Sequence, residues 1–285
     1  MSGLGARRGR ELPLRRALVL GLLHGPTELL PISSSAHTTL VPWLLGWPYG
    51  ELDPRLRKSF EVALHAGTAT ALLALPPWRP AGYGRRERPR LLVLACAAGP
   101  PALVGYALGE QIERRTGTPG TIAAGLLAGA VAMALAETGG GNRPIEQARP
   151  EDGLAVGGAQ ALALIPGLSR SGLARAAARA RGFGREPADR LCWQAGLPVI
   201  GGAALLQGIR LARHGVASEH RRALAVGAGA ALLSTSLSGR ILNGSARTRL
   251  LPATIAYRCA LGVLVIRRVR DNTGGTHKDT GPGKP

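Results

Sequence analysis

Apolar residues along the chain gather in stretches that polar or arginine-rich segments separate. The stretches cover residues 12–23, 38–47, 60–78, 91–109, 119–137, 153–166, 188–209, 222–238 and 250–267. Several approach the roughly 20 residues that a membrane-spanning helix needs, and others are about half that length. The pattern predicts an all-α, polytopic integral membrane protein. We expect one membrane domain over residues 1–268 and, from its polar composition, a disordered tail over residues 269–285.

Two short polar segments interrupt the apolar pattern, and both lie beside the shorter stretches. Residues 28–37 read ELLPISSSAH, and residues 165–172 read IPGLSRSG. Each has a proline shortly before a Ser-x-Ser pair, and such residues are costly at membrane depth unless they line a cavity. Their recurrence predicts a duplicated protein whose re-entrant or broken helices meet at a polar site. The two repeats would cover about residues 12–138 and 153–268.

The segments that follow the two motifs also resemble each other. Residues 64–75 read LHAGTATALLAL, and residues 193–206 read WQAGLPVIGGAALL. His65 and Gln194 are therefore candidate equivalents, and the small residues after them let membrane helices approach closely. A chance match between two alanine-rich helices is the alternative to duplication.

The positive charge of the chain does not alter the predicted membrane class. The formal charge is +19, and aromatic residues make up 4% of the chain. The basic residues fall mostly between apolar stretches, at residues 79–90, 210–222 and 267–285, which is typical of loops that face an anionic leaflet. The arginine-rich loops also explain a mean hydropathy of only +0.09. Because no recognised nucleic-acid motif is present, we expect no nucleic-acid partner.

The first motif contains candidate acid–base chemistry. His24 and Glu28 are four residues apart, so on a helix they share a face and could bind a metal or act as a general base. A structural hydrogen bond between them is the alternative. Ser33, Ser34 and Ser35 offer three hydroxyls near His37 and a carboxylate, and a serine in such surroundings could be an activated nucleophile. Serine runs also serve as loops or helix caps, which is the alternative here.

The second motif has the character of an anion site. Ser169 and Ser171 flank Arg170, and Gly167 and Gly172 permit a tight turn where a helix is expected to start. A helix N-terminus, hydroxyls and a guanidinium together favour phosphate, although a structural arginine between helices is the alternative. The combined motifs suit phosphoester chemistry in which a cation and Arg170 neutralise phosphate oxygens.

Two more arginines follow the second motif on the same predicted helix face. Ser171, Arg175 and Arg179 are spaced by four residues. Arginines within a membrane helix should face protein, water or an anion rather than lipid tails. We consider two interpretations: an enlarged anionic site, and a helix end that reaches the interface, where arginine side chains extend to water.

The two motifs are similar to those of a known family. Residues 28–37 resemble the E-F-L-P-x-S-S-x-G-H motif of the bacterial undecaprenyl-diphosphatases, the bacitracin-resistance family. Residues 166–172 resemble the P-G-x-S-R-S-G motif of that family, and residues 60–68 and 251–258 resemble two further family segments. The resemblance covers about residues 15–268.

The resemblance implies a multi-pass plasma-membrane hydrolase with an inverted repeat and two re-entrant helix pairs. It implies removal of one phosphate from undecaprenyl diphosphate, which recycles the lipid carrier for cell-wall synthesis and is linked to bacitracin resistance. The cofactor would be a divalent cation, Mg²⁺ or Ca²⁺ first and Mn²⁺ second. The partners would be the polyprenyl diphosphate lipid and the membrane, with a homodimer left open.

The resemblance also implies roles for individual residues. Ser34 would be the nucleophile with His37 assisting, Glu28 would serve metal binding or base chemistry, and Arg170 would hold phosphate. The residues expected to line the pocket are Ser33, Ser35, Ser169, Ser171 and Gly172. The second metal ligand would be His24.

The chain departs from the family pattern at several positions. The family usually has an acidic residue four positions before Glu28, where this chain has His24, and we expect the imidazole to favour softer ions such as Mn²⁺ or Zn²⁺. The glycine before the motif histidine is Ala36, and the stretch that carries Arg175 and Arg179 is normally apolar. A polyprenyl-phosphate flippase and a degenerate, non-catalytic paralogue are therefore the alternative functions.

Overall fold

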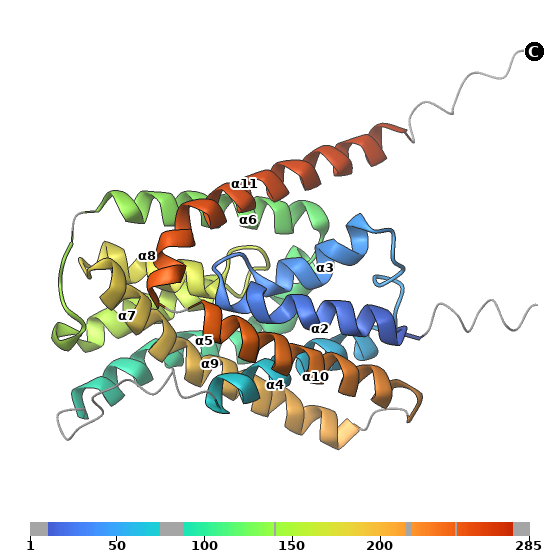
Figure 1. Ribbon diagram of the computed structural model, residues 1–285, viewed down its shortest axis with the longest axis horizontal. Coiled ribbons are helices and arrows are strands. Elements are labelled where there is room, and N and C mark those ends of the chain that lie inside the picture. The colour runs from blue at the N-terminus through green and yellow to red at the C-terminus, as the bar shows by residue number, and fades with distance from the viewer. Residues whose placement is uncertain (1–10, 75–87, 140, 215–217, 243, 276–285) are drawn as a thin grey trace, which may run out of the picture.

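The computed structural model describes residues 11–74, 88–139, 141–214, 218–242 and 244–275 (Figure 1). Over these residues the chain forms α-helices, one 3₁₀ turn and no β-strand, which confirms the predicted all-α class. The helices, in chain order, are α2 (Leu14–Leu29), α3 (Ser34–Leu44), α4 (Pro54–Ala74), α5 (Arg88–Thr116), α6 (Pro119–Thr138), α7 (Pro150–Leu162), α8 (Arg170–Ala180), α9 (Arg185–His214), α10 (Ser218–Ile241) and α11 (Gly244–Gly275).

Local sequence sets the ends of several helices. Leu30 precedes Pro31 and takes an extended backbone with ψ 150°, as residues before proline prefer, so α2 ends at Leu29. At the start of α6, the Thr118 side chain accepts a hydrogen bond from the backbone N–H of Thr121. At the other end of the chain, α11 continues to Gly275, beyond the expected start of the tail. The rest of that tail lies outside the described residues.

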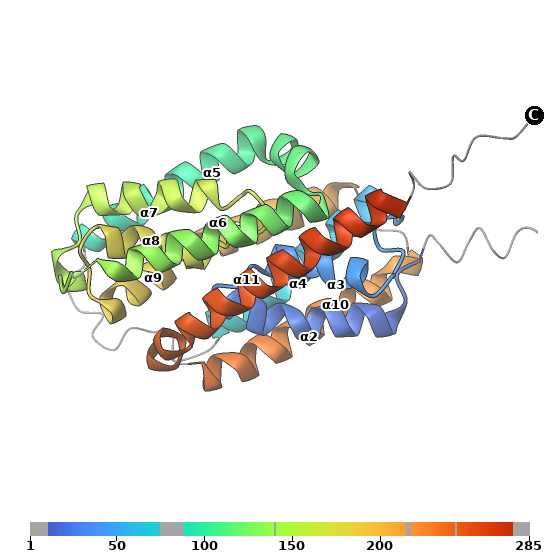
Figure 2. The same ribbon diagram turned by 90° about the horizontal axis from the view of Figure 1, so that it is seen from above.

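The order of helices repeats along the chain. In each half a pair of short helices, α2 and α3 or α7 and α8, is followed by three longer ones. The halves interlock, because α2 packs against α10 of the second half while α7 packs against α5 of the first. Helices α6 and α11, the last of each half, lie side by side (Figure 2). This order agrees with two repeats, whose boundaries stay a prediction.

Glycines allow the interlocked helices to touch. A Cβ added to Gly21 of α2 would lie 2.5 Å from the Gly227 carbonyl oxygen of α10. A Cβ added to Gly157 of α7 would lie 2.7 Å from the Cys96 carbonyl oxygen of α5. The two contacts have the same form in the two halves, and small residues at helix crossings are a common means of packing in membranes.

Several long helices are built for a bilayer. The candidate membrane spans among the described residues are Leu91–Thr116, Pro119–Thr138, Ser218–Ile241 and Ala246–Asn272. Their outward faces carry large exposed apolar side chains such as Leu103 and Leu135, which are 70% and 65% exposed. Such surfaces fit lipid rather than water. The re-entrant course of the two short helix pairs stays a prediction.

Candidate functional site

The two serine motifs form turns of the same geometry. Ser33 and Ser169 have φ of 74° and 69°, and they are the non-glycine residues with positive φ in the described part of the chain. The Ser33 Oγ accepts from the backbone N–H of Ala36, and the Ser169 Oγ accepts from that of Gly172, each at 3.4 Å. Each serine thus caps the helix that follows it. Strained backbone of this kind persists mainly at functional sites.

The remaining serines lie at the same two helix N-termini. The hydroxyls of Ser33 and Ser35 are 3.2 Å apart, and those of Ser169 and Ser171 are 3.5 Å apart. Gly172 contributes only its backbone to the site. A side chain would not fit at this position, because an added Cβ would lie 2.7 Å from the sulfur of Met133. The predicted lining residues therefore place hydroxyls at two helix N-termini, where backbone N–H groups and the helix dipole favour anions.

Glu28 joins the two motifs. The Ser34 hydroxyl donates to Glu28 Oε2 at 2.6 Å, and Arg170 Nη2 donates to Glu28 Oε1 at 3.1 Å. The guanidinium fits because Gly196 of α9 has no side chain, and an added Cβ there would lie 1.9 Å from Arg170 Nη1. The structure therefore brings together a carboxylate, a hydroxyl and a guanidinium from α2, α3 and α8.

Two imidazoles lie next to the same carboxylate. His24, Glu28 and His65 each offer one donor atom, and these atoms all lie within 4.8 Å of one another. His24 Nδ1 is 2.9 Å from the hydroxyl of Thr68, which is 3.2 Å from that of Thr235. Two nitrogen donors and one oxygen donor can hold a divalent cation. The donor set therefore fits a metal.

His65 was not among the predicted site residues. In the sequence it was noted only as the counterpart of Gln194. Its place beside Glu28 depends on how α4 packs against α2, which the sequence does not show. The available signal was its place in residues 60–68, which resemble a family segment. His24, in contrast, lies beside Glu28 as its helical spacing predicted.

His37 has partners other than Ser34. Its Nδ1 donates to the Ser33 carbonyl oxygen at 2.7 Å, so its Nε2 accepts from the Tyr257 hydroxyl, also at 2.7 Å. The Tyr257 and His37 rings are stacked with centroids 5.7 Å apart. Both ring nitrogens are thus in use, and assistance of Ser34 by His37 stays a prediction. Tyr257 belongs to residues 251–258, for which no role was predicted from the sequence.

Arg258 connects both serine turns to α6. It is fully buried and donates to the carbonyl oxygens of Pro31 at 3.0 Å and Gly167 at 2.8 Å. It also donates to the Leu126 carbonyl oxygen at 3.0 Å. An added Cβ at Gly129 would lie 2.1 Å from Arg258 Nη2, so that glycine makes room for the guanidinium. The side chain fixes the two turns relative to each other.

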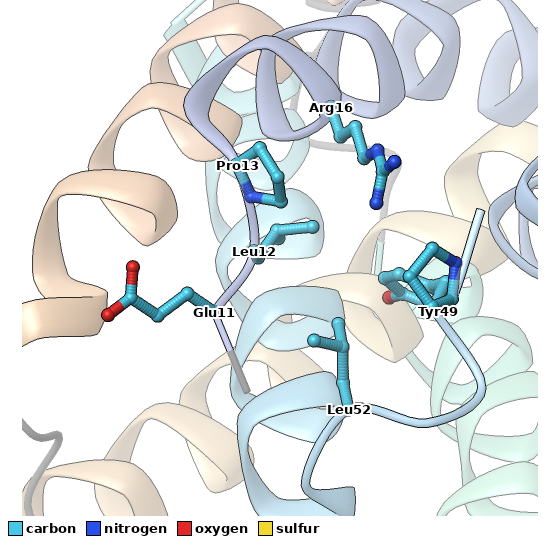
Figure 3. A pocket seen from close by; sticks show the side chains of 7 residues that line it. Glu11, Leu12, Pro13, Arg16, Tyr49 and Leu52 are labelled. Carbon is cyan, nitrogen blue, oxygen red and sulfur yellow. The ribbon is translucent and has the colours of Figure 1, made fainter. Parts of the chain in front are cut away.

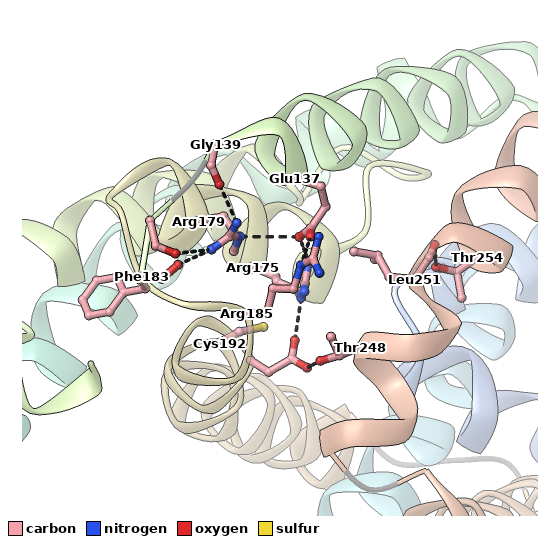
Figure 4. Close-up of polar contacts among 12 residues, drawn as sticks. Glu137, Gly139, Arg175, Arg179, Phe183, Arg185, Cys192, Thr248, Leu251 and Thr254 are labelled. Carbon is pink, nitrogen blue, oxygen red and sulfur yellow. Dashed lines mark hydrogen bonds and ion pairs between the residues drawn. The ribbon is translucent and has the colours of Figure 1, made fainter. Parts of the chain in front are cut away.

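Arg175 and Arg179 of α8 belong to an ionic cluster that is separate from the Arg170 site (Figure 4). Arg175 donates to Asp189 at 2.7 Å and to Glu137, which also pairs with Arg185 at 2.9 Å. Arg179 donates to the Phe183 carbonyl oxygen at 2.5 Å. Both arginines of the stripe are buried and face protein. The interpretations of an enlarged anionic site and of side chains that reach the interface are therefore wrong.

A small surface pocket lies away from this site, where the chain enters α2 (Figure 3). Its lining includes Leu12, Pro13, Tyr49 and Leu52. It shares no residue with either serine turn, and its lining is mostly apolar.

Comparison with known proteins gives one consistent result. Residues 17–264 match the family described as "Bacitracin resistance protein BacA". An undecaprenyl-diphosphatase of Geobacter metallireducens is 37% identical over 272 residues, which is 88% of this chain and 96% of that protein. The undecaprenyl-diphosphatase of Geobacter sulfurreducens is 36% identical over 90% of this chain and 98% of its own length. That of Thermomicrobium roseum is 36% identical over 88% of this chain and 96% of its own.

Proposed function

We propose that this chain, which belongs to the bacitracin resistance protein BacA family, is an undecaprenyl-diphosphatase of the cell membrane. It hydrolyses undecaprenyl diphosphate to undecaprenyl phosphate and inorganic phosphate and so recycles the lipid carrier for cell-wall synthesis. The observation that carries this function is the meeting of Glu28, Ser34 and Arg170 in a multi-pass membrane protein. Similarity to relatives with this name, over 88% and 90% of this chain, supports it.

Ser34 attacks the terminal phosphorus in the proposed reaction. Glu28 accepts the hydroxyl proton along their 2.6 Å hydrogen bond. The bond from phosphorus to the bridging oxygen breaks, and undecaprenyl phosphate leaves. Water then hydrolyses the phosphoserine, which releases inorganic phosphate and restores the Ser34 hydroxyl.

Arg170 and the serine turns hold the diphosphate. Arg170 exchanges its hydrogen bond with Glu28 for charge-assisted bonds to phosphate oxygens. The hydroxyls of Ser33, Ser35, Ser169 and Ser171 and the backbone of Gly172 lie at the N-termini of α3 and α8, where they can line the site of the anion. His37 lies on the first turn of α3 and is hydrogen-bonded to Tyr257. In the proposed reaction it assists Ser34.

A divalent cation completes the proposed site. The cation would be held by Glu28 and His24, and when bound it would neutralise charge on the phosphate oxygens. The fit is supported by Nε2 of His24, a buried nitrogen that has no hydrogen-bond partner among the described residues.

Phosphate release from the purified protein tests this function. The full chain in detergent, given undecaprenyl diphosphate, should release inorganic phosphate, and a chelator should slow the release. The Ser34→Ala variant is the control for contaminating phosphatase. A well-folded protein that binds the lipid without releasing phosphate would instead favour a flippase or a degenerate paralogue. Light scattering on the same sample tests the homodimer, which stays a prediction.

A further inference from the structure

We infer that His24, Glu28 and His65 form a metal site that selects transition-metal dications, such as Mn²⁺, Co²⁺ and Zn²⁺, over Mg²⁺ and Ca²⁺. The inference deepens the proposed function and rests on it for the role of the metal, although metal binding itself can be measured without turnover. The three donor atoms lie within 4.8 Å of one another and come from α2 and α4.

The hydrogen bonds of the two histidines leave one nitrogen of each ring available. Nδ1 of His65 lies 2.8 Å from the Glu61 carbonyl oxygen, so Nδ1 carries the proton and Nε2 carries a lone pair. Nδ1 of His24 pairs with the Thr68 hydroxyl at 2.9 Å, which leaves its Nε2 unpaired. Metal-bound histidines commonly have this arrangement, in which the second nitrogen is fixed by a carbonyl or another polar group.

The unpaired Nε2 of His24 is buried, which supports a metal ligand role for this nitrogen. The side chain is only 1% exposed, and a buried polar atom without a partner costs free energy. A metal ion bound to this nitrogen would remove that cost. Thr68 is fully buried and is itself hydrogen-bonded to Thr235 of α10. The hydrogen bond from Thr68 to Nδ1 therefore fixes the orientation of the His24 ring.

The chemistry of the donors decides which ions the site prefers. Mg²⁺ and Ca²⁺ take oxygen ligands, namely carboxylates, carbonyl groups, waters and, for Mg²⁺, substrate phosphates. Here a single carboxylate is joined by two imidazoles, which suit Mn²⁺ less than Zn²⁺ or Co²⁺ but suit all three better than Mg²⁺. Arg170 also reduces the negative charge at Glu28, which weakens the site most for ions held mainly by charge.

Direct metal binding tests the inference. The full chain is purified without a polyhistidine tag, stripped of metal and titrated separately with Zn²⁺, Co²⁺, Mg²⁺ and Ca²⁺ by calorimetry. We expect one Zn²⁺ or Co²⁺ per chain, with visible d–d absorption from bound Co²⁺ and at least about tenfold weaker binding of Mg²⁺. His65→Ala and His24→Ala should each weaken Co²⁺ binding by about tenfold or more.

Two further variants keep the test decisive. His220→Ala is the matched control, because His220 lies at the start of α10 beside Glu219 and away from the site, and Co²⁺ binding should not change. His24→Glu replaces nitrogen by oxygen and should move the preference toward Mg²⁺ while binding is kept, which a misfolded variant could not show.

The two proposals fail in different ways. Equal affinity for Mg²⁺ and Co²⁺, or full Co²⁺ binding by His65→Ala, would overturn the metal site even if phosphate is released. Selective Co²⁺ binding that needs both histidines, together with no phosphate release under any metal, would support the site and overturn the phosphatase.

Discussion

The hydroxyl of Ser34 donates a 2.6 Å hydrogen bond to Glu28 Oε2 across the turn that separates α2 from α3. The other oxygen of the same carboxylate accepts from Arg170, which comes from the second half of the chain. In the proposed reaction, Glu28 takes the Ser34 proton and holds the Arg170 guanidinium until a phosphate anion replaces the carboxylate. Both contacts lead to predictions about the site.

Ser34 and Glu28 should behave as one unit. Ser34→Ala and Glu28→Gln should each lower turnover by about 100-fold or more, because each removes one side of the same proton transfer. The double variant should cost little beyond either single change. Rates of phosphate release from purified variants give the answer, and losses that multiply would show that the residues act separately.

Arg170 should not tolerate replacement by lysine. Arg170→Lys keeps the charge but loses the planar pair of donors that binds phosphate, so most activity should be lost while the protein still inserts into the membrane. Phosphate release, measured beside membrane content of the variant, checks this. Near-normal turnover would remove Arg170 from the proposed mechanism.

Gly196 should be needed because Arg170 occupies the space beside it. In Gly196→Ala the new Cβ would meet Arg170 Nη1 at 1.9 Å, so the guanidinium must shift, and kcat/KM should fall by roughly 100-fold. Gly201→Ala in the same helix is the matched control, because its Cβ would meet nothing within 4 Å. Equal effects of the two changes would point to a general effect on α9.

Arg175 should matter for stability rather than for substrate. Arg175→Met leaves Asp189 and Glu137 without this partner and should lower the free energy of unfolding by about 3–5 kcal/mol. Arg190→Met removes an exposed pair with Glu186 and should cost less than about 1 kcal/mol. Thermal unfolding in detergent measures both. A raised KM for the lipid with unchanged stability would contradict the structural role of Arg175.

Asp152, at the start of α7, gives a prediction for pH. Burial alone would raise the pKa of its carboxyl, but hydrogen bonds from Arg143 and Arg181 outweigh burial and hold that pKa below its ordinary value. A lowered pKa stabilises the fold above the unfolded value of about 3.9 and ceases to do so as pH falls through the folded value. Asp152→Asn should therefore lower the unfolding temperature at neutral pH.

Unfolding temperatures measured at acidic pH separate this charge effect from a packing defect. The difference in unfolding temperature between the wild type and Asp152→Asn should shrink below about pH 4, where the wild-type carboxyl also loses its charge. A difference that stays constant down to pH 2 would mean that the charge of Asp152 is not what stabilises α7.

Local sequence predicted the parts of the site that local geometry decides. Breaks at prolines, serine caps and a spacing of four residues each involve only a few positions. Breaks in the helices near Ser33 and Ser169, and the shared helix face of His24 and Glu28, could therefore be predicted from the sequence. The meeting of the two halves was predicted because their motifs recur.

Contacts between distant helices could not be read in this way. The stripe of Arg175 and Arg179 resembled an anion path because their partners Glu137 and Asp189 lie on other helices. His65 depends on how α4 packs beside α2, which no local pattern records. Arg258 binds carbonyl oxygens, which every residue has, so its partners leave no trace in the sequence.

The position of Arg258 has a consequence for how the enzyme is made. Glu28, Ser34 and Arg170 are all synthesised before α11, yet the side chain that holds the Pro31 and Gly167 turns together arrives with this last helix. A nascent chain that has not yet inserted α11 carries all three residues but not the contact that aligns them. We therefore expect a chain that lacks α11 to be inactive, although it carries all three residues.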